Sequence, residues 1–142
     1  MMTEQQNTEM SQEQLSVWVR EQFQRANKHL AENGVLFDSV VTEVSRYLAP
    51  FVAVWKIKSS DNKYFWVISG DLPCDFFPFE NEATARAAIR RFSMLWQIKA
   101  ENINRLTGTD KTQQDFANLL IAKAEDLYTI QADESVWKDY TS

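Results

Sequence analysis

Two runs rich in β-branched and aromatic residues, separated by four turn-forming residues, constrain the fold of this chain most. The runs are FVAVWKIK (51–58) and KYFWVIS (63–69), and Ser-Ser-Asp-Asn lies between them. Val, Ile and aromatic residues favour strands, whereas Ser, Asp and Asn favour turns, so the sequence predicts an antiparallel hairpin. A two-stranded hairpin is only marginally stable in water. The rest of the chain must therefore cover it or extend it, or a second chain must pair with it.

The segment before the hairpin carries two helical patterns. In residues 11–33, Ser11 and Gln14 have the spacing of a capping box, and apolar residues recur at steps of three and four. Residues 38–49 carry a shorter pattern of the same kind. Three valines weaken this second helix because β-branched side chains disfavour helices. A strand over 35–41 is the alternative interpretation.

The segment after the hairpin predicts two longer helices, over 81–106 and 112–130. Apolar residues of the first recur at alternating steps of four and three, and only Lys99 interrupts them. Between the hairpin and this helix, residues 75–79 could add a third strand, which Pro78 would confine to a sheet edge.

These elements predict an α+β fold in which four main helices pack on a small antiparallel β-hairpin or sheet. A chain of 142 residues has the ordinary length of one domain. We expect that domain over residues 11–142, after a flexible N-terminal segment over 1–10. The N-terminus lacks the basic and apolar regions of a secretory signal, and no apolar run reaches about 18 residues. We therefore expect a cytoplasmic protein without a membrane partner.

Charge and cysteine content narrow the classes of function. A formal net charge of -5 argues against non-specific nucleic-acid binding, which needs Lys and Arg beside the phosphates. Cys74 is the only cysteine, so no internal disulfide can form and a reducing compartment fits best. Because His29 is the only histidine, one chain cannot build a Cys/His zinc site. We expect no nucleic-acid partner, no metal and no cofactor.

The turn after the second predicted strand reads Gly-Asp-Leu-Pro-Cys-Asp and contains two carboxylates, Asp71 and Asp75. Gly70 permits a sharp turn and Pro73 stiffens it. A carboxylate pair could perform acid–base chemistry or bind a hard cation. The alternative is structural, because an Asp side chain in a turn accepts hydrogen bonds from nearby backbone N–H groups. The structural interpretation is the stronger one for Asp71.

Arg86 and Arg90 lie one turn apart on the long predicted helix. Solvated charges or internal ion pairs would explain them. They could also clamp an anion, since guanidinium groups match carboxylate and phosphate. A small-molecule or cation site between the hairpin and this helix would then use Asp71, Asp75, Arg86 and Arg90, with Trp66 as a wall. A hydrolase or transferase could be built on it, so enzymatic activity stays open.

Three aromatic residues around Pro78 could belong to the core or to an exposed interface: Phe76, Phe77 and Phe79. The chain is also rich in Trp, Phe, Met and Arg, the residue types that interface cores favour. It shows no assembled set of nucleophile, base and metal ligands. Our first interpretation is a non-enzymatic cytoplasmic binding or interaction module. Its partner would be a second copy, giving a homo-oligomer, or an unknown protein.

Three blocks of the sequence, SRYLAPFVAVWKI, WVISGDLPCD and RRFSMLWQIKAENI, resemble the signature blocks of a known family. This is a small, uncharacterised bacterial family that is known only as a domain of unknown function. The resemblance covers nearly the whole chain beyond the first ten residues, and WVISGDLP is its most specific part. It implies no activity, cofactor or substrate, but it draws attention to residues 66–75 and to the helix over 81–106.

Overall fold

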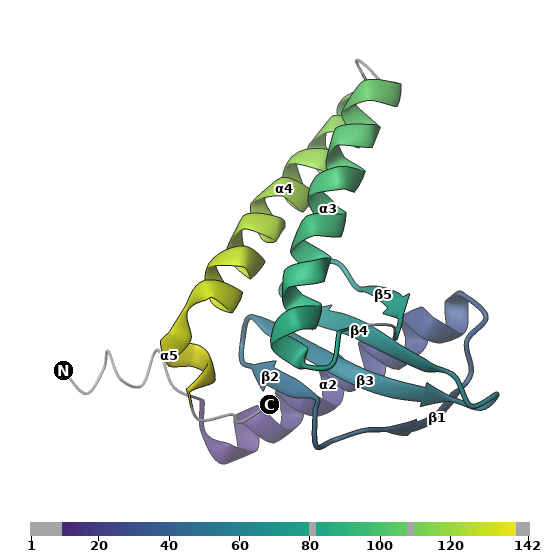
Figure 1. Ribbon diagram of the computed structural model, residues 1–142, viewed down its shortest axis with the longest axis vertical. Helices are drawn as coiled ribbons and strands as arrows, with labels where there is room; N and C mark the ends of the chain where they lie inside the picture. Colours follow the sequence, from purple (N-terminus) through teal and green to yellow (C-terminus); the bar gives the residue numbers. More distant parts are fainter. Residues whose placement is uncertain (1–9, 80–81, 108–109, 139–142) are drawn as a thin grey trace. The chain divides into compact units, whose positions relative to one another are not determined.

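A computed structural model describes residues 10–79, 82–107 and 110–138. The chain divides into two compact units, Met1–Asn81 and Glu82–Ser142. The α+β fold class is confirmed, while one domain over 11–142 stays a prediction. The segment over 1–10 that was predicted to be flexible lies, except for residue 10, outside the described residues. Among its described residues, the first unit contains one helix and five strands (Figure 1): α2 (Gln12–Glu32), β1 (Phe37–Val40), β2 (Arg46–Leu48), β3 (Val52–Ser59), β4 (Tyr64–Gly70) and β5 (Asp75–Pro78).

The strands form one antiparallel sheet in which β1, β3, β4 and β5 lie in that order and β2 also pairs with β3. The predicted hairpin is β3–β4, which pairs from Val52 with Gly70 to Lys58 with Tyr64. Asn62 adopts a left-handed conformation with φ 67° in its turn, as Asn often does. The predicted third strand is confirmed as β5, which ends at Pro78 on a sheet edge.

The predicted helix over 38–49 is wrong, and the alternative strand over 35–41 is correct. This segment instead forms two short strands, β1 and β2, which pair with opposite halves of β3. Its β-branched residues fit a strand better than a helix, and the free edge of β3 offers hydrogen-bond partners to an extended backbone.

A serine fills the gap between β1 and β2. The Ser45 hydroxyl donates to the carbonyl of Val41 (2.8 Å) and accepts from the backbone N–H of Lys56 (2.9 Å). Ser45 is buried, and both bonds are partly shielded from bulk water. Its side chain thus supplies the partner that a continuous edge strand would have given to β3.

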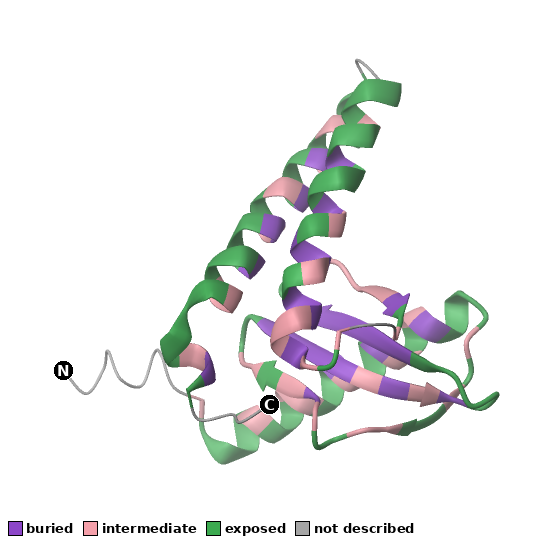
Figure 2. Ribbon diagram, viewed as in Figure 1, coloured by how far each residue is buried: buried purple, intermediate pink, exposed green. Residues whose placement is uncertain are grey.

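The core of the first unit lies between α2 and one face of the sheet. Figure 2 shows the burial along β3 and β4, the two central strands. Alternate residues point toward α2, and the helix contributes Ala26 and Leu30, both 0% exposed. The buried members of this core are Ala26, Leu30, Ala53, Trp55, Ile57, Phe65 and Val67.

The second unit is a helical hairpin with a short third helix: α3 (Ala85–Thr107), α4 (Lys111–Ala132) and α5 (Glu134–Trp137). Both long helices predicted after the strands are confirmed within a few residues. The Ser93 hydroxyl donates to the carbonyl of Ala124 (2.7 Å), and Trp137 Nε1 donates to the carbonyl of Ile130 (3.1 Å). Lys99, which interrupts the apolar pattern, lies 5.7 Å from the ring centre of Phe116.

Candidate functional site

The corner after β4, residues Gly70–Pro73, passes very close to the start of β3. Gly70 has φ 137°, and a Cβ there would overlap with the carbonyl oxygen of Phe51 and lie 2.8 Å from the Cα of Val52. The backbone N–H of Asp71 donates to that Phe51 carbonyl (2.9 Å). Only glycine fits this combination of left-handed conformation and close approach.

Two side chains connect this corner to α2. Arg25 Nη1 donates to the carbonyl of Gly70 (2.6 Å), and its Nη2 donates to the carbonyl of Leu72 (3.4 Å). The buried Ser69 hydroxyl donates to the backbone carbonyl of Gln22 (3.1 Å) and accepts from Trp55 Nε1 (3.1 Å). The conspicuous WVISGDLP block therefore attaches the helix to the sheet.

The predicted carboxylate pair belongs to this corner. Asp71 is exposed and Asp75 is half-buried. Asp75 Oδ1 accepts from the backbone N–H of Phe76 (2.8 Å), which is a local turn contact. Among residues 10–79, 82–107 and 110–138, no three His, Cys, Asp or Glu side chains gather as a metal site requires. A chemical role for the pair stays a prediction.

Cys74, between these two acids, is half-buried. Burial raises the pKa of its thiol, and the charges of Asp75 and Glu32 add to this, while Arg25 opposes it. A raised pKa leaves little thiolate at neutral pH, which disfavours a nucleophilic role.

The other residues of the predicted pocket lie on different units. Arg86, in the second unit, donates through Nε to the carbonyl of Gln131 (2.7 Å) and pairs with Glu134 (3.2 Å). Arg90 is exposed on the same helix. Trp66 belongs to the first unit and is fully buried. The combined site of these residues with the two Asp side chains stays a prediction.

The three phenylalanines of the predicted interface differ in exposure. Phe77 is buried, whereas Phe76 and Phe79 are half-buried. The Phe76 ring meets the His29 ring edge-to-face at 5.7 Å, and Lys56 Nζ lies 3.9 Å from the ring centre of Phe79. These contacts occupy part of each ring, and an interface here stays a prediction.

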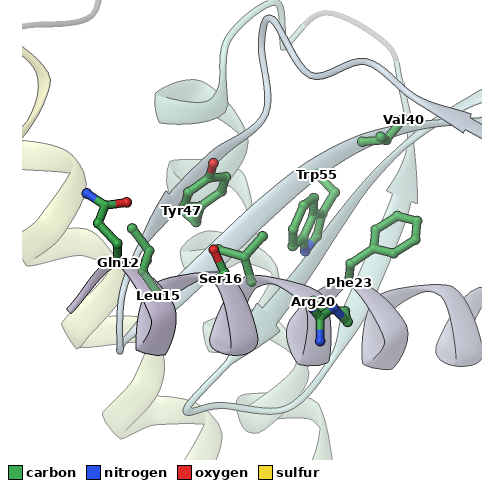
Figure 3. Close-up of a pocket in the computed structure, with 9 residues that line it drawn as sticks. Gln12, Leu15, Ser16, Arg20, Phe23, Val40, Tyr47 and Trp55 are labelled. Carbon is green, nitrogen blue, oxygen red and sulfur yellow. The ribbon is translucent and has the colours of Figure 1, made fainter. Parts of the chain in front are cut away.

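The first unit also contains a groove that was not among the sites predicted from the sequence. It lies between the first three turns of α2 and the neighbouring strands, and its volume is about 460 Å³. Figure 3 shows α2 on one side and Tyr47, Trp55 and Val40 on the other. We call it the α2 groove; its lining residues are Gln12, Leu15, Ser16, Val19, Arg20, Phe23, Val40, Tyr47 and Trp55.

Aromatic side chains form much of the α2 groove. Trp55 is only 5% exposed and meets Phe23 edge-to-face, with ring centres 5.4 Å apart. Tyr47 is 43% exposed, and its ring centre lies 6.1 Å from that of Trp55. Arg20 is exposed at the same groove and forms no ion pair with any residue that the structure describes.

The sequence held one signal for this groove. Leu15, Val19 and Phe23 repeat at steps of four on α2, so an apolar row there was evident. The sequence did not predict the opposite wall, because Tyr47 belongs to the segment over 38–49 that was wrongly predicted to be a helix.

Comparison with known proteins gives a family and no relative of known activity. Neither the curated proteins nor the solved structures return a match. In the part of the chain that the structure describes, no helix has the length and apolar character needed to cross a membrane. A family model covers residues 12–137, in agreement with the resemblance noted in the sequence. The chain belongs to the family described as a domain of unknown function, DUF4826.

Proposed function

We propose that this protein is a non-enzymatic binding module and that the α2 groove is its binding site. One observation carries the proposal: an aromatic groove of about 460 Å³ lies open beside an arginine without an ionic partner among the described residues. Small-molecule sites are concave, mostly apolar and roughly 300–1,000 Å³ in volume, with a few polar groups. The α2 groove has each of these properties.

The lining predicts the chemistry of the ligand. Phe23 and Tyr47, which pack on the buried Trp55, offer ring surfaces to a flat or aliphatic body. Arg20 offers a guanidinium group, which forms strong charge-assisted hydrogen bonds with a carboxylate. We therefore expect a small aromatic or aliphatic acid with one carboxylate near Arg20.

The same lining favours binding over catalysis. It contains two hydroxyl groups, those of Ser16 and Tyr47, but no His, Cys, Asp or Glu. A hydroxyl nucleophile needs an adjacent general base, and the lining supplies none.

The test is calorimetric titration of the full chain with 1-naphthoate, an aromatic carboxylate. We expect one binding site, about tenfold weaker in Arg20→Gln because a charge-assisted hydrogen bond is lost. Ser16→Trp should abolish binding by filling the groove from an exposed lining position.

Two controls make the test specific. Lys28→Gln removes a cation from an exposed position of the same helix, outside the groove, and should leave the affinity unchanged. The neutral analogue 1-naphthamide should bind equally to the wild type and to Arg20→Gln. Absence of 1-naphthoate binding, or equal affinity in Arg20→Gln, would contradict the proposal.

A cytoplasmic location and a homodimer belong to the same proposal. The single, half-buried Cys74 supports a reducing compartment. The composition, rich in Trp, Phe, Met and Arg, supports contact with a second chain. Native mass spectrometry of the undenatured protein tests the homodimer: a two-chain mass would support it and a one-chain mass would contradict it.

A further inference from the structure

A second groove lies within the helical hairpin of the second unit. Its volume is about 590 Å³, and its walls are one side of α3 and one side of α4. Met94 and Ile98 are 52% and 53% exposed, although both are large and apolar. We call it the hairpin groove; its lining residues are Met94, Gln97, Ile98, Glu101, Ile121 and Glu125.

The groove follows from how the two helices pack. The buried faces of α3 and α4 combine large side chains, such as Trp96 and Leu120 (both 1% exposed), with the small residues Ala100, Ala117 and Ala124 (0% exposed). Met94 and Ile98 lie one turn apart on α3, outside these buried faces. Two packed helices with an apolar row at their junction form a surface that a third helix can bind.

The charges at the hairpin groove have one sign. Glu101 and Glu125 are both exposed, and the lining has no Lys or Arg. Within residues 82–107 and 110–138, neither glutamate forms an ion pair. Gln97 Nε2 donates to the Ser93 hydroxyl (3.3 Å). This hydrogen bond holds the Gln97 amide close to the surface of α3.

We propose that the hairpin groove binds a basic amphipathic helix of another protein. Apolar side chains of that helix would pack on Met94, Ile98 and Ile121, and Lys or Arg side chains beside them would pair with Glu101 and Glu125. Met94 helps such a site accept different side chains, because its flexible thioether fills irregular gaps.

A second copy of this chain fits the groove less well. A two-fold contact between identical grooves would bring Glu101 and Glu125 of both chains into one interface. Like charges at an interface disfavour association. This proposal goes beyond the proposed function, which concerns a small acid in the α2 groove of the other unit.

The probe is the amphipathic Leu/Lys peptide LKKLLKLLKKLLKL, labelled with fluorescein and titrated with the full chain by fluorescence anisotropy. We expect saturable binding of one peptide per chain. The double variant Met94→Ser/Ile98→Ser should weaken it at least about tenfold, since it removes the exposed apolar row. Glu101→Gln/Glu125→Gln should weaken it several-fold and reduce its dependence on salt.

Matched controls come from α4, one of the two helices that form the groove. Leu119→Ser removes another exposed apolar side chain, and Asp126→Asn neutralises the residue next to Glu125; neither residue lines the groove. Both variants should bind the peptide like the wild type. Circular dichroism checks that each variant keeps its helices.

Three outcomes would overturn the proposal. The first is no saturable binding of the Leu/Lys peptide. The second is equal affinity in the groove variants and the control variants, which would mean non-specific attraction to an acidic protein. The third is a two-chain mass that Ile98→Ser reduces to one chain, which would assign the surface to self-association. Binding of 1-naphthoate is measured separately, so either proposal can fail alone.

Discussion

The two halves of α2 lie over the same face of the sheet but are attached to it very differently. The C-terminal half is closed onto the strands, with Ala26 and Leu30 fully buried and Arg25 bonded to the corner at Gly70–Pro73. The N-terminal half leaves the α2 groove open, although its row of Leu15, Val19 and Phe23 is equally apolar. The small side chain of Ala26 and the polar bonds to the corner therefore help the helix approach the sheet closely, and hydrophobicity alone does not.

The largest expected effect on stability comes from Gly70→Ala, which would disrupt the contact between the corner and the start of β3, beside the C-terminal half of α2. A Cβ at this position meets the backbone of Phe51 and Val52, and the residue has φ 137°. We expect a loss of about 3 kcal/mol or more in the free energy of unfolding, measured in urea. Gly34→Ala is the matched control: its φ is 83° with no atom within 4 Å, so about 1 kcal/mol is expected. Equal losses would mean that the close approach is unimportant.

The next largest effect distinguishes Arg25 from Arg20, the two arginines of α2, by how much each contributes to stability. Arg25→Gln removes the hydrogen bonds to Gly70 and Leu72 and should cost about 1–2 kcal/mol in thermal or urea unfolding. Arg20→Gln should change stability by less than about 0.5 kcal/mol, as exposed substitutions without structural contacts usually do. The comparison fails if Arg20→Gln is as destabilising as Arg25→Gln.

The smallest effect is kinetic and concerns Cys74. Because burial raises its pKa, the folded thiol holds its proton to higher pH than the unfolded thiol. Iodoacetamide should therefore react more slowly with the native protein than with the protein in urea, and mass spectrometry of the adduct measures both rates. By linkage, this group's contribution to stability is complete below the unfolded pKa and falls as pH rises above it.

The variant Arg25→Gln tests whether the rate of Cys74 alkylation depends on the Arg25 charge or on burial. The Arg25 charge lowers the Cys74 pKa, so losing it in an intact corner should slow alkylation further. Faster alkylation in the variant would show instead that the corner has opened and that Cys74 has lost its burial.

Local sequence patterns predicted most of the fold. The hairpin and the three long helices follow from periodicity within each segment, so they could be found without knowing their neighbours. β1 and β2 could not, because strands of four and three residues take their conformation from β3, which lies elsewhere in the sequence. The second predicted helix was wrong for this reason.

The candidate functional sites, like the short strands, could be predicted only where they depend on neighbouring residues in the sequence. The sequence indicated that Gly70 turns the chain, while the structural interpretation of Asp71 stays a prediction. It could not indicate that Arg25 and Ser69 connect the corner to α2, because these contacts join residues 45 to 47 positions apart. The α2 groove was missed because two residues of its second wall, Val40 and Tyr47, belong to β1 and β2, which only pairing with β3 creates.

The division of the outer edge into β1 and β2, with Ser45 between them, bears on how this chain avoids aggregation. An exposed strand edge recruits other strands when it offers a long row of unpaired backbone groups. Here one edge is divided into pieces of four and three residues, and the other consists of four residues that end at Pro78. Neither edge is long enough to template a stable intermolecular sheet, so the protein can keep hydrophobic central strands while its edges discourage fibril-like stacking.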